Sequence, residues 1–530
     1  MLNLLLCALA LSAPQDNWTA LRLPELCEES NPSAQFPALD CGGHIQLAEA
    51  TNENPRGLRA PLSAMEVGSL LERGAGAAGR KLTLFPYAPP LLARGSAPDL
   101  RWAKETLKVI DAAGKHNRLT ISAWLVPQNA AQVPGAGDEW PNARSWQTTV
   151  QPGAEVVFGQ RQHTDFIATY DVNVATDSGV AAPRVGGFFT GKTVHLSASR
   201  VDGGASYHLR GLLDMAELAT LTEFDPDTPD LGTILQPILN TVTVAFSGVA
   251  RSGEFLRVEL EGTPLLESHW TLFVRVNGTL AGSGMSAEVE PWRAIDVSLL
   301  SKRARSLPSF GPGAGLHGQG VLEAMTPQAA LISASGVLSA VEQNQPGGRA
   351  NLSSSGNRPP VQICEGLLLM PAGSDGGLAQ QVASFVRSVE KPRLASCQVQ
   401  LKSGTFRASF PMASGEVGRL SVGQERTFLT GYRVEIAPHS WMPAPMVEHS
   451  FDGLAWQGRS SADQLTMSSW ISKTESVLVR DRYQTHLGAL QLPKRSVRGA
   501  RKTGMIGQDT LSVMADLEGS PGLRMELQPL

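Results

Sequence analysis

Apolar and polar residues alternate in several stretches of the chain, most clearly over Phe166–Ala175 and Phe428–Ala437. In the first stretch Tyr170, Val172 and Val174 would lie on one face, and the residues between them on the other. A period of two over this length is typical of a strand with one buried face. Both stretches are therefore predicted to be half-buried β-strands.

The two stretches belong to a longer internal match. A Gly-Gln pair, expected to be a turn because glycine allows positive φ, precedes each strand, and an Ala-Pro pair and a further glycine follow at the same spacing. The repeat-defining residues are Gly159, Gln160, Tyr170, Pro183 and Gly191 in the first copy and Gly423, Gln424, Tyr432, Pro445 and Gly453 in the second. The chain is predicted to carry one unit twice, over residues 58–300 and 318–530.

Each unit is predicted to begin with a small strand–helix–strand module. In the first copy a strand at Lys81–Pro86 precedes an amphipathic helix at Asp99–Ala112 and a strand at Leu119–Val126. The corresponding segments of the second copy are Val361–Leu369, a helix at Leu378–Val389, and Ala395–Leu401. The fold class is predicted as α+β and strand-rich: two diverged repeats, each a small βαβ-like module followed by an antiparallel β-domain.

This interpretation divides the chain into seven parts. They are a signal peptide (1–13), an N-terminal extension (14–57), an α/β module (58–130) and a β-rich domain (131–300), a linker (301–317), and then a second module (318–404) and a second β-rich domain (405–530). A chain of 530 residues is too long for a single small core.

Composition narrows the class of protein. Charged residues make up 18%, apolar residues 42%, and the net charge is -4 with acids and bases mixed along the chain. No basic stripe indicates nucleic acid, so no nucleic-acid partner is expected.

The first 13 residues form an apolar run that ends in small residues, which predicts a secretory signal peptide; a buried N-terminal element is the alternative. Four cysteines then remain: Cys27, Cys41, Cys364 and Cys397. Local disulfides Cys27–Cys41 and Cys364–Cys397 are the simplest pairing in an exported chain, and free buried thiols are the alternative.

The sequence offers no motif for catalysis. His195 and His208 lack partners at ligand spacing, and the acids Asp225, Asp227 and Asp230 are better explained as an acidic turn than as a calcium loop. No enzyme activity, catalytic residue, metal or cofactor is predicted.

One segment could form a binding loop. Trp441, Met442 and Met446 lie among prolines, with the segment Thr176–Val185 as their counterpart in the first copy. Exposed aromatic and methionine side chains would make a binding surface, but a proline-braced loop packed on its own sheet is the favoured explanation.

The strand Phe166–Ala175, the residues Ala182–Gly186 and Gly191–Val194, and the strand Ser206–Gly211 together resemble the β-domain of secretins of type II and type III secretion systems, in a divergent planctomycete-type form. The resemblance covers roughly residues 100–262, and more faintly 378–519. It implies a non-enzymatic envelope protein of the periplasm or outer membrane, with protein partners that are copies of itself or secretion-system components, and it allows association with the outer membrane. The alternative is a stand-alone periplasmic or surface binding protein unrelated to secretion.

Overall fold

The computed structural model describes a defined part of the chain, and the structural statements below concern these residues. They are 17–21, 44–46, 68, 71–72, 75, 80–85, 91–116, 119–127, 144–150, 155–174, 176, 178–201, 206–225, 231–278, 286–289, 292–296, 362–364, 367–371, 396–414, 416–438, 440–460, 464–479, 490–505 and 524–529.

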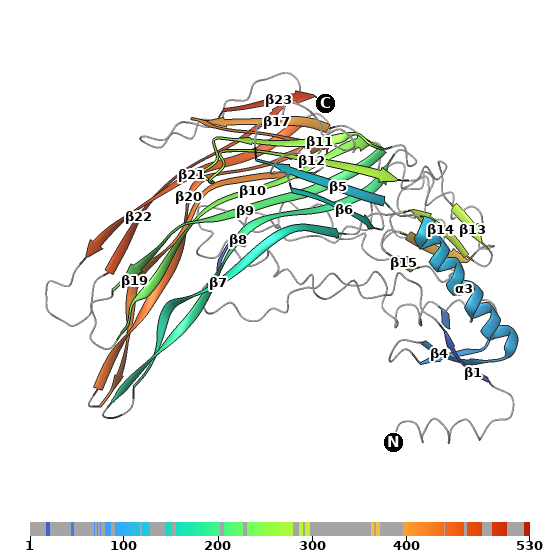
Figure 1. Ribbon diagram of the computed structural model, residues 1–530, viewed down its shortest axis with the longest axis horizontal. Coiled ribbons are helices and arrows are strands. Elements are labelled where there is room, and N and C mark those ends of the chain that lie inside the picture. The colour runs from blue at the N-terminus through green and yellow to red at the C-terminus, as the bar shows by residue number, and fades with distance from the viewer. Residues whose placement is uncertain are drawn as a thin grey trace, which may run out of the picture.

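Long antiparallel strands dominate the structure (Figure 1). The largest sheet has nine strands in the order β2-β8-β9-β10-β19-β20-β21-β22, with β7 paired to β8. Its strands are β2 (Ile45–Gln46), β7 (Glu155–Val174), β8 (Gly179–Val201), β9 (Ser206–Phe224), β10 (Ile234–Arg251), β19 (Val417–Ala437), β20 (Ser440–Ser460), β21 (Gln464–Val479) and β22 (Leu490–Met505).

A second sheet of seven shorter strands lies against it in the order β23-β17-β18-β11-β12-β5-β6. These strands are β5 (Leu119–Val126), β6 (Arg144–Val150), β11 (Phe255–Glu261), β12 (His269–Gly278), β17 (Ser396–Ser403), β18 (Phe406–Ala413) and β23 (Arg524–Pro529). Two small sheets complete the fold: β1 (Asn17–Leu21), β4 (Leu91–Gly95) and β3 (Leu82–Phe85) in one, and β13 (Ser286–Val289), β14 (Trp292–Asp296), β16 (Leu367–Pro371) and β15 (Gln362–Cys364) in the other.

The predicted α+β class is wrong, because the fold is mostly β, with 82% of it in strands and 7% helical. The helix predicted over Asp99–Ala112 is present as α3 (Ala97–His116). However, the strands on its two sides lie in different sheets, β4 with β1 and β3, and β5 between β12 and β6, and every ladder is antiparallel. A βαβ unit needs parallel neighbours in one sheet, which a strand–helix–strand pattern alone cannot guarantee. The helix predicted over Leu378–Val389 lies outside the described residues.

Several of the predicted strands are present, although the predicted modules are not. The strand expected at Leu119–Val126 is β5, and the one expected at Ala395–Leu401 is β17. The stretch Val361–Leu369 divides into the hairpin β15–β16.

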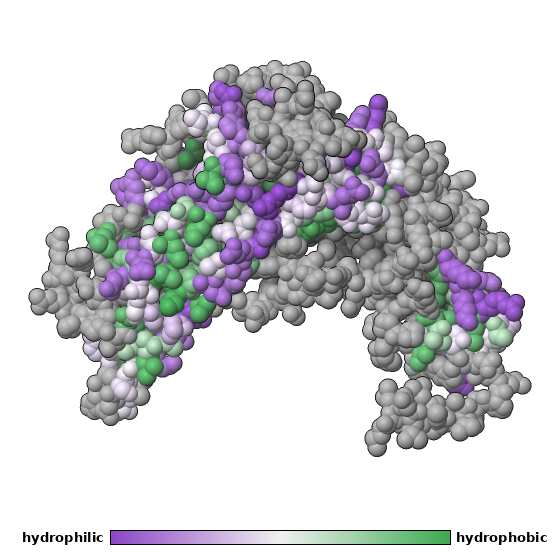
Figure 2. Space-filling model, in the orientation of Figure 1, coloured by the Kyte–Doolittle hydropathy of each residue, from purple (hydrophilic) through white to green (hydrophobic). Residues whose placement is uncertain are grey.

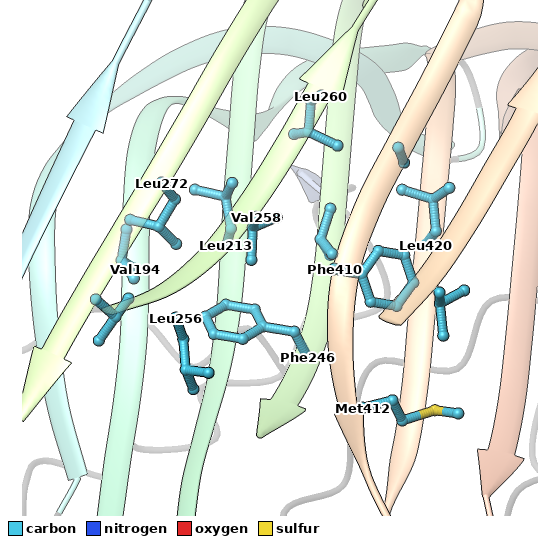
Figure 3. Packing of buried hydrophobic residues seen from close by; sticks show 14 of the residues in the cluster. Val194, Leu213, Phe246, Leu256, Val258, Leu260, Leu272, Phe410, Met412 and Leu420 are labelled. Carbon is cyan, nitrogen blue, oxygen red and sulfur yellow. The ribbon is translucent and has the colours of Figure 1, made fainter. Parts of the chain in front are cut away.

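The main core fills the space between the two large sheets (Figure 3). Val194, Leu213, Val244, Leu420 and Trp456 are register partners on neighbouring strands, so they share the face that meets the second sheet. Each large apolar side chain buried in this way contributes roughly 1.5–3 kcal/mol to stability. The core draws on strands of both predicted β-rich domains, since β10 pairs with β19 in one sheet and β11 pairs with β18 in the other.

The hairpins β7–β8 and β19–β20 have matching registers. Tyr170 lies opposite Pro183, and Tyr432 lies opposite Pro445. The ladder of β7 is interrupted between Ile167 and Thr169, and that of β19 between Leu429 and Gly431, so the two bulges fall at equivalent places in the aligned copies. The duplication itself stays a prediction.

Glycines mark a close approach of the two strands in each hairpin. A Cβ at Gly159 would lie 2.1 Å from the Lys192 carbonyl oxygen, and one at Gly191 would lie 2.1 Å from that of Gln160. Gly423 and Gly453 face each other in β19–β20 with equally short approaches to backbone oxygens. The Gly-Gln pairs therefore lie inside β7 and β19, so the prediction of turns at these pairs was wrong.

Candidate functional site

The predicted binding loop is part of a strand. Trp441, Met442 and Met446 lie near the start of β20, paired with β19, so the loop prediction was wrong. Trp441 and Met446 are 44% and 50% exposed, whereas Met442 is buried with Val172 and Leu231. Alternation along the strand separates residues that the sequence had placed on one surface.

The other predicted residues do not meet in one place. Cys397, in β17, is a buried free thiol, and burial raises its pKa to about 11. Cys364 lies in β15, which belongs to a different sheet from β17, while Cys27 and Cys41 fall outside the described residues. The described residues contain no group of three or more metal-ligating side chains set to hold an ion.

The acidic and histidine candidates are also dispersed. His195 and His208 are buried on β8 and β9. Asp225 directly follows β9, whereas Asp227 and Asp230 lie outside the part of the chain that the structure describes.

A buried charge cluster that the sequence did not predict lies on the face of the nine-stranded sheet opposite the main core. His44 places Nδ1 2.7 Å from Glu425 Oε1 and Nε2 2.9 Å from Asp214 Oδ1. Its exposed fraction is 4%, and those of Asp214 and Glu425 are 2% and 1%. Thr243 donates to Asp214 over 2.8 Å, and Arg161 forms an ion pair with the same carboxylate.

The strand registers explain why these groups meet. Asp214 on β9 lies opposite Thr243 on β10, and Glu425 on β19 lies opposite Leu239, which is four residues from Thr243 along β10. Because side chains alternate with a period of two, all four lie on one face of the sheet. His44 precedes β2, which lies along β8 and thereby delivers the imidazole to this face.

The geometry requires a charged histidine when the carboxylates are ionised. Both ring nitrogens of His44 face carboxylate oxygens, so both must donate, as only the imidazolium can. Burial alone would lower the pKa of His44, but the charges of Asp214 and Glu425 and their hydrogen bonds outweigh it and raise the pKa to about 10. Burial alone would raise the pKa values of both carboxyls, but the charges facing them, chiefly His44, hold both well below the usual range.

One signal in the sequence could have revealed the cluster. Asp214 interrupts the otherwise apolar run Leu212–Ala216, and a charge inside such a run is normally paired or exposed. Nothing in the local pattern links it to His44 or Glu425, which are 170 and 211 residues away along the chain.

The cluster predicts a pH dependence of stability. A group whose folded pKa is raised stabilises fully below its unfolded pKa, about 6.5 for histidine, and loses this contribution as pH rises through the folded value near 10. At ~1.4 kcal/mol per pKa unit, the free energy of unfolding should fall by up to ~5 kcal/mol between pH 6.5 and 10 because of His44. Urea unfolding across this range would measure it.

The control for this experiment is His163→Gln, which changes an exposed histidine of β7 paired with Asp165. That variant should keep the wild-type slope between pH 6.5 and 10, whereas His44→Gln should lose it. Parallel curves for wild type and His44→Gln would contradict the charge assignment.

The edges of the nine-stranded sheet form a second notable feature. Among the described strands, β7 pairs only with β8 and β22 pairs only with β21, so each leaves one backbone edge without a partner strand. The two edges differ in charge: β22 carries five basic residues and no acidic one, whereas β7 carries three acidic residues, Glu155, Asp165 and Asp171, and one arginine, Arg161. Unpaired edges of such length are templates for pairing with another chain.

Exposed apolar side chains gather at the far ends of the long hairpins, a surface we term the distal patch. It consists of Val180, Val185, Val434, Ile436, Trp441, Met446, Leu478 and Leu492. Figure 2 shows apolar side chains along the left arm of the molecule, which the long hairpins form. The hairpins β7–β8 and β19–β20 contact each other there, since the Thr169 hydroxyl donates to the Pro445 carbonyl over 2.7 Å. Large apolar side chains exposed on three hairpins of one sheet are candidates for an interaction site with proteins or membranes.

In the part of the chain that the structure describes, no helix has the length and apolar character of a membrane span.

Comparisons with known proteins point to one group of solved structures. No protein-family model matches the chain, and no curated protein matches it. The chain is similar to the secretin domain of InvG from the Salmonella SPI-1 injectisome, at 11% identity and a TM-score of 0.25 over 52% of this chain and 91% of the other. A second structure of InvG from the same injectisome gives 13% identity and a TM-score of 0.22 over 50% and 84%. The type IV competence pilus secretin PilQ of V. cholerae gives 10% identity and a TM-score of 0.22 over 52% and 80%.

Proposed function

We propose that the chain is an exported, non-enzymatic component of a cell-envelope assembly of the secretion type, and that its long β-sheet is the part that assembles. The observation that carries this proposal is the pair of open edges, β7 and β22, on one sheet of long strands. The resemblance of Phe166–Ala175 and the following strands to secretin β-domains supports it, as does the lack of a catalytic constellation in the sequence.

The charges of the two edges favour contact between unlike edges. Basic β22 of one copy would meet β7 of the next, which carries three carboxylates, whereas two β22 edges would repel each other. A contact between different surfaces of identical chains is heterologous, and it generates a closed ring when the rotation closes. Protein partners are therefore further copies of this chain, with other secretion components as additional candidates.

The chain offers a template for that contact. If the second group of strands repeats the first, β22 corresponds to β10 and β7 corresponds to β19. The ladder in which Ile238–Ala245 pairs with Arg419–Arg426 inside one chain would then recur between β22 and β7 of neighbouring copies.

The distal patch extends the proposal to localisation. Apolar side chains exposed together at the hairpin ends suit contact with the outer membrane or with another envelope component, whereas a free periplasmic surface would leave them in water. The exposed apolar side chains and the predicted signal peptide support the periplasm or outer membrane as the proposed location.

Light scattering coupled to size exclusion tests the assembly. The wild-type protein should form a defined oligomer, and the double variant Lys494→Glu and Arg498→Glu, at two exposed positions of β22, should weaken it at least tenfold. The matched control, Arg101→Glu and Lys104→Glu, makes the same charge change at exposed positions of α3 and should leave it unchanged.

A strict monomer in buffer and in detergent, at every concentration reached, would contradict the proposal and favour the stand-alone binding protein. Equal weakening by the α3 control would show that net charge rather than the β22 edge governs association.

A further inference from the structure

The nine-stranded sheet has an acceptor site where β9 leaves β8, which we define as residues 187–189 of β8 together with the carboxylates of Asp214 and Glu425. The two strands pair from Gly191 to Val201 of β8, and beyond Gly191 the ladder ends. Along the next residues β2 takes the place of β9, with Ile45 opposite Phe188 and Gln46 opposite Gly187. The Phe189 amide donates to the His44 carbonyl over 2.9 Å, which continues this short ladder.

Side-chain contacts are the main interactions that hold the segment 44–46 at this position. Ile45, 5% exposed, packs with Phe166, Phe188 and Leu239 in a small core of its own. A strand of two residues has too few ladder bonds to stay in place by itself. The imidazolium and the backbone amide of His44 supply the further hydrogen bonds that hold the segment, and the amide donates to Glu425 Oε2 over 2.8 Å.

The contacts of His44 reach strands that are far apart in the chain. Asp214 belongs to β9 and Glu425 to β19, and β10 runs between them. The groups facing these carboxylates from the packed strands are Arg161 of β7 and Thr243 of β10 at Asp214, and His449 of β20 at Glu425. Without His44, Glu425 would keep only His449 at 3.3 Å, and Asp214 would keep Arg161 and Thr243.

We propose that residues 44–46 are a strap that binds at this acceptor site and holds β8 and β9 against β19. The charged imidazolium of His44 makes the contacts that keep the strap in place. The acceptor site thus suits one extended segment in which a cationic residue precedes a branched apolar residue. Its occupant is residues 44–46 of the same chain. When the strap leaves, the β8 backbone at residues 187–189 and both carboxylates become accessible while the main core stays intact. All contacts of the strap lie within one chain, so its role is independent of the proposed oligomer.

Hydrogen exchange of the full-length protein tests the strap. In His44→Gln the amide of Phe189, which donates to the His44 carbonyl, should exchange at least tenfold faster than in wild type. The amide of Val244, in the main core, should stay within twofold. The control His269→Gln, which changes a partly buried histidine of β12 in the seven-stranded sheet, should leave both amides unchanged.

A second variant covers the case in which His44→Gln fails to fold, and a peptide tests the folded His44→Gln protein directly. Glu425→Gln keeps Asp214 paired with both His44 and Arg161. This variant should also raise the exchange rate of the Phe189 amide at least tenfold. A synthetic peptide of residues 42–48 added in excess should restore protection at Phe189 in His44→Gln, and the same peptide with glutamine for histidine should not. Exchange at Phe189 within twofold of wild type in both folded variants would overturn the proposal. So would an equal loss of protection at Phe189 and Val244, which would make His44 an ordinary part of the core.

Discussion

Replacing Gly159 with alanine should lower the free energy of unfolding by about 3–5 kcal/mol. Gly159 has a φ of 129°, which side chains other than that of glycine rarely allow, and a Cβ there would lie 2.1 Å from the Lys192 carbonyl oxygen. Backbone strain of this kind costs about 1–3 kcal/mol, and the overlap with a fixed backbone atom costs about as much again. The β7–β8 ladder would have to open at this point.

Gly431→Ala is the matched control for this substitution. It lies inside the equivalent hairpin β19–β20, and the nearest atom to its added Cβ is Met446 Sδ at 3.8 Å, an ordinary contact. Thermal unfolding followed by circular dichroism should separate the two variants by several degrees or more. Equal melting temperatures would show that the hairpin does not need the close approach at Gly159.

Replacing Trp456 with alanine should cost about 3–5 kcal/mol, the range for a large aromatic side chain removed from a packed core. Trp456 is fully buried on β20 and meets Phe410 of β18 edge-to-face, with ring centroids 5.6 Å apart. The pair connects the nine-stranded sheet to the seven-stranded sheet. The loss therefore includes both a cavity and the aromatic contact between the sheets.

Trp441→Ala provides the comparison within the same strand. Trp441 is 44% exposed at the start of β20, so its removal should cost less than about 1 kcal/mol. Urea unfolding of both variants measures the difference. If the Trp441 variant lost as much stability as the Trp456 variant, the assignment of the main core would be wrong.

The sequence predicted strands well where one face of a strand is buried. Alternation located Phe166–Ala175 and Leu119–Val126, and the amphipathic pattern located α3. These predictions succeed because side-chain periodicity is a local property of the backbone. Which strand pairs with which is not local, and for this reason the βαβ-like modules were predicted wrongly although their strands and the first helix exist.

Glycine was misinterpreted for a related reason. Gly159 and Gly423 were expected in turns, where positive φ is common, but they allow two long strands to approach closely within a ladder. The glycines themselves are visible in the sequence. The partner backbone that requires them, about 30 residues away in each hairpin, is not.

The charge cluster was missed because its members are separated by most of the chain. His44 and Glu425 are 381 residues apart, and only the curvature and register of the sheet bring them within 2.7 Å. The binding loop failed for the opposite reason: Trp441, Met442 and Met446 are neighbours in sequence, but pairing with β19 gives Met442 an environment different from that of the other two.

The continuity of both sheets across the predicted repeat has a consequence for chain connectivity. Ile238–Ala245 pairs with Arg419–Arg426, Glu259–Glu261 pairs with Arg407–Ser409, and one apolar core lies beneath both ladders. The halves on either side of residues 297–361 are thus joined by an interface like that of an obligate heterodimer. A cut in that connecting segment should leave two fragments that stay associated and fold only in each other's presence, so that a gene split there would encode a working two-subunit protein.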